Sequence, residues 1–116
     1  MVNNHGTVAV LFDLEDTLVQ TRWAEHQYII EFRRKTKEKL IELGIPPSVL
    51  KGIERATIMR NKSIEYIEKN LAKADAEKIY QQMEKFFIRY ELDSAKKSKL
   101  FPDTIPALRG LRALGY

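Results

Sequence analysis

A short apolar run that leads into three carboxylates constrains the fold of this chain more than any other feature. The run, Val-Ala-Val-Leu-Phe, occupies residues 8–12, and Asp13, Glu15 and Asp16 follow it. Consecutive β-branched and aromatic residues are typical of a strand buried on both faces inside a parallel sheet. We therefore predict one strand at about residues 7–13. The turn after such a strand lies at the carboxyl edge of the sheet, where open α/β sheets bind ligands.

The carboxylates at this turn predict a cation site. Acidic groups this close together repel one another unless a cation lies among them, and carboxylate oxygens are ligands that Mg²⁺ prefers. Asp13 is the first of the three and directly follows the apolar run. We therefore expect a Mg²⁺ site at this turn, with Asp13 also available as a nucleophile.

Residues 12–19, Phe-Asp-Leu-Glu-Asp-Thr-Leu-Val, resemble the first motif of the haloacid dehalogenase (HAD) superfamily, a hydrophobic strand followed by Asp-x-Asp-Gly-Thr-Leu/Val. The resemblance implies that Asp13 attacks phosphorus, becomes a phosphoaspartate and binds the metal. It implies that Glu15 protonates the leaving group, later activates water, and offers its backbone carbonyl to the metal. Thr17 would support the loop.

Two residues of this motif differ from the family pattern, because Glu15 replaces Asp and Asp16 replaces Gly. The longer Glu15 side chain can still carry protons, but a displacement of about 1 Å can lower a rate on the order of 10²-fold. Asp tolerates left-handed backbone angles, so Asp16 is a reasonable substitute for Gly in a tight turn. Two alternatives remain open: Asp13 as a residue that caps the turn, and Glu15 as a solvent-facing loop carboxylate.

Helical periodicity dominates the rest of the chain. Apolar residues recur at three- and four-residue spacings, which predicts long helices at about residues 22–43, 56–71 and 75–92. Gly44 and two prolines after it end the first helix. Because the connections are short, these helices predict an antiparallel bundle of three to four helices. Asp103 is the predicted N-cap of a last helix that Gly115 ends.

The order of these segments also resembles the HAD branch that contains phosphoglycolate phosphatases and 2-haloacid dehalogenases. In that branch a helical cap follows the first motif, and an aromatic-Pro-Gly/Asp stretch, here residues 101–103, begins the helix that returns to the core. The implied fold is α/β, a Rossmann-like core plus a helical cap, although this chain itself is mostly α. Residues 1–21 would then be the first strand and catalytic loop, 22–92 the cap, and 93–116 a linker and the return helix.

The resemblance covers only the front half of the family fold. The phosphate-binding Ser or Thr of the family, its Lys and its late acidic pair have no counterpart in these 116 residues. A phosphoryl-transfer site depends on positioning and charge stabilisation, so we expect the chain to be inactive alone. Two explanations remain open: the chain is the truncated front half of a longer hydrolase, without the C-terminal half, or it forms a homodimer.

The composition is that of a soluble globular protein without disulfide bonds. There is no cysteine, which excludes a disulfide scaffold and cysteine nucleophiles, and the 44% hydrophobic and 31% charged content is typical of a soluble globular protein. No apolar run is long enough to cross a membrane and no signal segment is seen, so we expect a cytoplasmic protein without membrane contact. The many Lys, Arg and Glu residues resemble thermophile composition.

The net charge of +4 raises the question of nucleic-acid binding. Basic clusters lie at residues 33–37 and 96–99, but Glu31, Glu38 and Glu42 alternate with the first cluster at helical spacing. A solvated helix face with i,i+4 ion pairs explains this pattern, and no RRM or KH motif accompanies the charge. We therefore favour the solvated face over nucleic-acid binding.

Three functions remain as hypotheses. The preferred one is a HAD-type, Mg²⁺-dependent phosphatase that acts on a small phosphorylated metabolite; the acidic residue at position 15 favours it over a dehalogenase. Trp23 directly follows the loop, and both a place in the substrate pocket and core packing remain open for it. The second hypothesis is a non-catalytic helical module that dimerises. The least favoured is a basic nucleic-acid binder.

Overall fold

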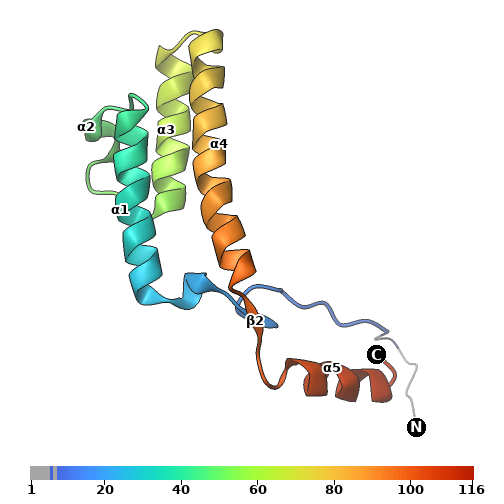
Figure 1. Ribbon diagram of the computed structural model, residues 1–116. Coiled ribbons are helices and arrows are strands. Elements are labelled where there is room, and N and C mark those ends of the chain that lie inside the picture. The colour runs from blue at the N-terminus through green and yellow to red at the C-terminus, as the bar shows by residue number, and fades with distance from the viewer. Residues whose placement is uncertain (1–5, 7) are drawn as a thin grey trace. The chain divides into compact units, whose positions relative to one another are not determined.

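The computed structural model describes residue 6 and residues 8–116, and Figure 1 shows that this part of the chain is mostly helical. Two strands of two residues each, β1 (Val19–Gln20) and β2 (Lys99–Leu100), pair antiparallel with Val19 opposite Leu100. The helices follow in chain order: the 3₁₀ helix η1 (Arg22–Ala24), then α1 (His26–Glu42), α2 (Pro47–Leu50), α3 (Ala56–Asn70), α4 (Lys73–Lys96) and α5 (Thr104–Ala113). None of these helices is long and apolar enough to cross a lipid bilayer.

The chain divides into two compact units. The terminal unit combines the described residues up to Ala24 with Ser94–Tyr116, and the helical unit is the continuous segment Glu25–Asp93. The last residues of α4 belong to the terminal unit, while the rest of that helix belongs to the helical unit. The helical unit is therefore an insertion between two segments that pack together.

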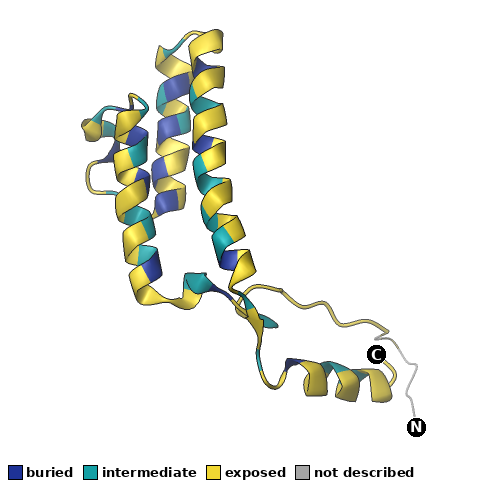
Figure 2. Cartoon of the chain, in the orientation of Figure 1, coloured by how far each residue is buried: buried dark blue, intermediate teal, exposed yellow. Residues whose placement is uncertain are grey.

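The helical unit has a core that follows the predicted spacing. On α3, Met59, Ser63 and Ile67 recur every four residues and are all buried, as the periodicity predicts. Figure 2 shows buried positions recurring along α1, α3 and α4. The buried core residues from these helices and the α2 region form one cluster: Leu40, Ile45, Leu50, Met59, Ile67, Ala76 and Met83.

An aromatic cluster connects α1 with α4 inside this unit. The Phe32 ring on α1 lies 4.7 Å from the Tyr90 ring and 6.2 Å from the Phe86 ring, measured between centroids. The hydroxyl of Tyr28 donates a 2.9 Å hydrogen bond to the backbone carbonyl of Tyr90. Aromatic pairs at these distances add to the stability that their burial gives, so the cluster holds the two helices together.

The C-terminus of α1 confirms the role predicted for Gly44. This glycine has a φ of 104°, its N–H donates to the carbonyl of Ile41, and the N–H of Ile45 donates to the carbonyl of Leu40. These are the two hydrogen bonds of a Schellman motif, and the fully buried Ile45 provides its hydrophobic contact. A side chain with a Cβ is strained at such a φ, which is why glycine ends the helix here.

The strand predicted at about residues 7–13 is wrong for the described part of that range. Residues 8–14 have no regular secondary structure, and their apolar side chains are exposed, with Leu11 at 95% and Phe12 at 43%. Residue 7 lies outside the described residues. A strand needs a neighbouring strand for its backbone hydrogen bonds, and no described segment pairs with this one. The structure is mostly α, and it does not contain the parallel sheet of an α/β fold in its described part.

The third long helix also differs from its prediction. It begins two residues before Asp75 and continues to Lys96, four residues beyond the predicted end at residue 92 and into the segment predicted to be a linker. Ser94 in its last turns is 2% exposed, and its Oγ accepts a 3.2 Å hydrogen bond from the N–H of Arg22. This buried tertiary contact extends the helix beyond the end that the local charge pattern indicates.

Candidate functional site

The residues predicted to form the catalytic loop make a compact turn in the terminal unit. The N–H groups of Leu18 and Val19 both donate to the carbonyl of Leu14, at 3.0 and 3.1 Å, which closes one helical turn. The N–H of Asp16 donates to the carbonyl of Val19 at 2.6 Å. The chain then enters β1 directly. One turn therefore places Asp13 and Glu15 just before the β1–β2 pair.

Asp16 holds this turn through both its backbone and its side chain. Its φ is 58°, the left-handed conformation that aspartate was expected to tolerate in place of glycine. Its carboxylate accepts hydrogen bonds from the N–H of Thr21 at 2.9 Å and from the Thr21 hydroxyl at 3.0 Å. Thr21 is buried, and its Oγ1 in turn accepts the N–H of Trp23 at 3.2 Å. The Asp16 carboxylate thus links the loop to η1.

Thr104 holds the other side of the loop. Its hydroxyl donates a 2.7 Å hydrogen bond to the carbonyl of Leu18, which also accepts the N–H of Phe101 at 3.3 Å. Thr104 is the first residue of α5 and is 4% exposed, whereas Asp103 before it makes no side-chain capping bond. The sequence pattern singled out Asp103 and missed both Thr104 and Ser94. Their only sequence signal is a small hydroxyl side chain at a helix end.

The two residues proposed for chemistry lie on the solvent side of the turn. Asp13 and Glu15 are both exposed, as is Thr17, and neither carboxylate forms an ion pair with a described residue. No three potential ligands from His, Cys, Asp and Glu come together anywhere in the described part of the chain. Trp23 is half-buried in η1. The described loop therefore presents two accessible carboxylates without a basic side chain that neutralises them.

An apolar hollow lies beside the segment that leads to the loop. It has a volume of about 290 Å³, and Val10 and Phe12 line it together with residues of α5 and the C-terminal segment. Leu111 and Tyr116 contribute from that second side, and Arg112 provides its one charged group. The segment and the face of α5 thus expose apolar side chains toward the same space, which is a surface that another apolar element can cover.

No family model, no curated protein and no solved structure matches this chain. Asp13 and Glu15 are the groups with accessible chemistry, while Asp16, Thr21 and Thr104 hold the backbone between them and the rest of the terminal unit.

Proposed function

We propose that this chain supplies the nucleophile loop and the helical cap of a HAD-type, Mg²⁺-dependent phosphohydrolase that acts on a small phosphorylated metabolite. The observation that carries the proposal is the loop geometry. Two exposed carboxylates, Asp13 and Glu15, lead into a one-turn loop, and the residue at the family's glycine position, Asp16, has a left-handed φ of 58°.

The position of the helical insertion supports the same proposal. The strand that leaves the loop, β1, pairs with β2, the strand that follows α4, so the chain departs from the terminal unit and returns to it side by side. The inserted segment Glu25–Asp93 has its own buried core. A cap domain in a HAD hydrolase has this connectivity, because it is inserted directly after the first motif.

In the proposed reaction, a carboxylate oxygen of Asp13 attacks phosphorus and the bond to the leaving oxygen breaks. Glu15 gives its proton to that leaving oxygen. Water then attacks the phosphorus of the phosphoaspartate and gives a proton to Glu15. The bond between the Asp13 oxygen and phosphorus breaks, so phosphate is released and the Asp13 carboxylate is restored. Each residue ends in the protonation state in which it began. Splitting the transfer into two displacements is the usual advantage of a covalent nucleophile.

The donor set of the loop fits Mg²⁺. This ion binds through one or two carboxylates, substrate phosphate and several waters rather than through an all-protein cage. The exposed carboxylate of Asp13 and the carbonyl of Glu15 would hold it, and the ion would offset charge on the transferred phosphoryl group. The described residues supply no third acidic ligand close to these two.

The groups that grip phosphate in this family are absent from the 116 residues, so we propose that a further core element completes the site. The exposed apolar residues at 8–14 support this view, since a second strand would bury them and provide their backbone hydrogen bonds. Without that element, Asp13 lacks the Lys and Ser or Thr that stabilise the dianionic substrate, and we expect no turnover.

The test is a fusion of this chain to the C-terminal core half of a HAD phosphatase with a helical cap, assayed with p-nitrophenyl phosphate and Mg²⁺. The fusion should hydrolyse the ester, Asp13→Asn should abolish hydrolysis, and Asp75→Asn, an exposed aspartate on α4, should leave it unchanged. A fusion that melts cooperatively but shows no Mg²⁺-dependent turnover would contradict the proposal. Turnover that survives Asp13→Asn would contradict it equally.

The exposed apolar surface of the terminal unit favours a second candidate function, a non-catalytic module that dimerises. Leu11 and Leu114 are both largely exposed, and a symmetric dimer could bury them. Sedimentation velocity of the chain alone separates the two candidates. A concentration-dependent dimer together with an inactive, folded fusion would favour the dimerisation module.

A further inference from the structure

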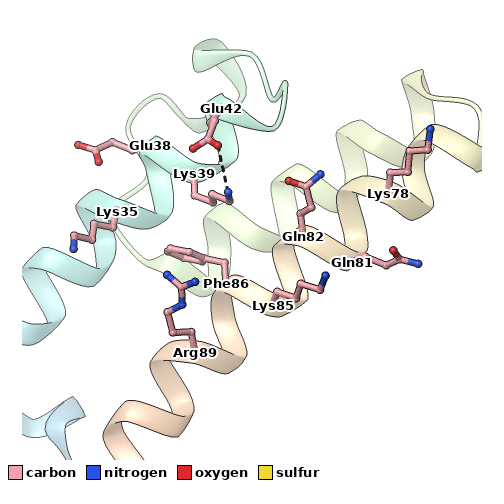
Figure 3. A pocket seen from close by; sticks show the side chains of 10 residues that line it. All are labelled: Lys35, Glu38, Lys39, Glu42, Lys78, Gln81, Gln82, Lys85, Phe86 and Arg89. Carbon is pink, nitrogen blue, oxygen red and sulfur yellow. Dashed lines mark hydrogen bonds and ion pairs between the residues drawn. The ribbon is translucent and has the colours of Figure 1, made fainter.

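A polar groove lies between α1 and α4 inside the helical unit, and no loop residue lines it. Its volume is about 750 Å³, and ten residues line it, four from α1 and six from α4 (Figure 3). Most of these side chains are exposed, so the groove is open along its length. Small-molecule sites usually enclose most of their ligand, whereas an open groove between helices suits an elongated partner.

The charge of the groove is strongly unequal between its two walls. The α1 wall carries two lysines and two glutamates, and both glutamates are already paired, Glu38 with Arg34 at 2.7 Å and Glu42 with Lys39 at 3.3 Å. The α4 wall carries three cations and no carboxylate. The groove as a whole therefore has five cations against two anions, and the excess lies on α4.

The cations of the α4 wall lie on one face of the helix. Lys78, Lys85 and Arg89 are separated by seven and four residues, which returns to the same side of an α-helix. None of the three forms an ion pair with a described residue. From Lys78 to Arg89 the helix rises by roughly 16 Å, the length of about three turns of a second helix.

We propose that this groove binds an acidic helical segment of a partner protein, with its carboxylates directed at the α4 wall. Phe86 lies between Lys85 and Arg89 in sequence and is half-buried, so it offers an apolar contact for a Leu or Met of the partner. Arginine is among the residues that dominate binding energy at protein interfaces, and phenylalanine is enriched at such interfaces.

The α1 wall favours an acidic helix over a nucleic acid. A phosphodiester chain is charged at every nucleotide, and it would bring phosphates close to Glu38 and Glu42 on that wall. An amphipathic helix can restrict its carboxylates to the side that meets α4. The two unlike walls therefore select a partner with negative charge on one face, and they also set its orientation in the groove.

Fluorescence anisotropy with the full chain tests this proposal. The probe is a labelled helical peptide of about 18 residues with glutamates on one face and leucines beside them, and its control has glutamine in place of each glutamate. The double variant Lys85→Glu/Arg89→Glu should weaken binding of the acidic peptide by about tenfold or more. The matched control, Lys69→Glu/Lys73→Glu, makes the same change in net charge outside the groove and should stay within about twofold of the wild type.

Each of the following outcomes would contradict the proposal. Equal weakening by both double variants would show that binding follows net charge and not the groove. Tighter binding of a single-stranded oligonucleotide of the same charge would identify a nucleic-acid site instead. If the glutamine peptide bound equally well, or if the acidic peptide did not bind at low salt, attraction between carboxylates and the cations of the α4 wall would not explain binding. Circular dichroism of each variant verifies that the helical unit remains folded.

Discussion

The hydroxyl of Thr104 donates a 2.7 Å hydrogen bond to the carbonyl of Leu18, across 86 positions of sequence. This bond joins the first residue of α5 to the end of the loop that carries Asp13 and Glu15. The donor side chain is buried, so water replaces the bond poorly if it is lost. The geometry of the candidate catalytic loop thus depends on a residue near the C-terminal end of the sequence.

Thr104→Val should destabilise the chain by about 1 kcal/mol, because it keeps the shape of the side chain and removes the donor. The carbonyl of Leu18 would retain only the longer bond from Phe101. Urea unfolding measures the change. The same substitution at Thr17, which is exposed and makes no side-chain hydrogen bond to a described residue, should change stability by less than about 0.5 kcal/mol. Equal effects at the two positions would contradict this role for Thr104.

Substitutions of Asp16 should separate its backbone role from its side-chain role. Asp16→Gly loses the hydrogen bonds from the N–H and the hydroxyl of Thr21 but accepts the φ of 58° without strain. Asp16→Ala loses the same bonds and also carries the strain of a left-handed alanine. We expect Ala to be less stable than Gly by about 1 kcal/mol in urea unfolding. Asp103→Ala is the control, since Asp103 has a negative φ and no capping bond. Equal stability of the Ala and Gly variants would show that the left-handed turn is not maintained.

In a fusion that shows the proposed Mg²⁺-dependent turnover, the length of the Glu15 side chain should limit the rate. Glu15→Gln removes the proton donor and should lower kcat by about 10²-fold or more. Glu15→Asp shortens the side chain by one methylene, to the length of the Asp at this position of the HAD motif that the loop resembles, and we expect it to raise kcat by up to about 10²-fold. Steady-state kinetics with p-nitrophenyl phosphate measures both. A wild-type rate left unchanged by Glu15→Gln would exclude this residue as the acid and base.

Leu11→Asp should reduce association without destabilising the chain. Leu11 is 95% exposed, so its replacement should change the free energy of unfolding by less than about 0.5 kcal/mol. If the segment at residues 8–14 docks against a partner strand or a second copy, the charged residue should weaken that contact in sedimentation velocity. Ile58→Asp, at a partly exposed apolar position of α3, is the control. Unchanged association with Leu11→Asp would exclude the segment from the interface.

Glu31→Gln should lower the pKa of Lys35 toward its ordinary value of 10.5. The hydrogen bond from the Lys35 ammonium to Glu31, at 3.2 Å, raises that pKa in the folded chain, and the nearby Tyr90 adds to the effect. Stability from this pair is present below the unfolded pKa and is lost as pH rises through the higher folded pKa. NMR titration of the Lys35 side chain checks the direction, and an unchanged pKa in the variant would contradict it.

The sequence by itself determined the helical unit and the turn residues, because these depend on local patterns. Every-fourth-residue spacing places Met59, Ser63 and Ile67 on one buried face, and only a glycine is unstrained at the φ of Gly44. The left-handed turn at Asp16 follows from the same local chemistry. For these features, the residues that carry the sequence pattern are also the residues that form the structure.

Tertiary structure alone decided the features that depend on distant partners. An apolar run such as residues 8–12 becomes a strand only if another strand pairs with it, and no described segment does. Three other features also depend on residues far apart in the chain. Ser94, in the extension of α4, bonds Arg22, and Thr104 bonds Leu18. The groove with unequal walls is lined by residues of both α1 and α4. The spacing of apolar residues predicts which face of a helix is buried, but it does not predict which distant residue packs against that face.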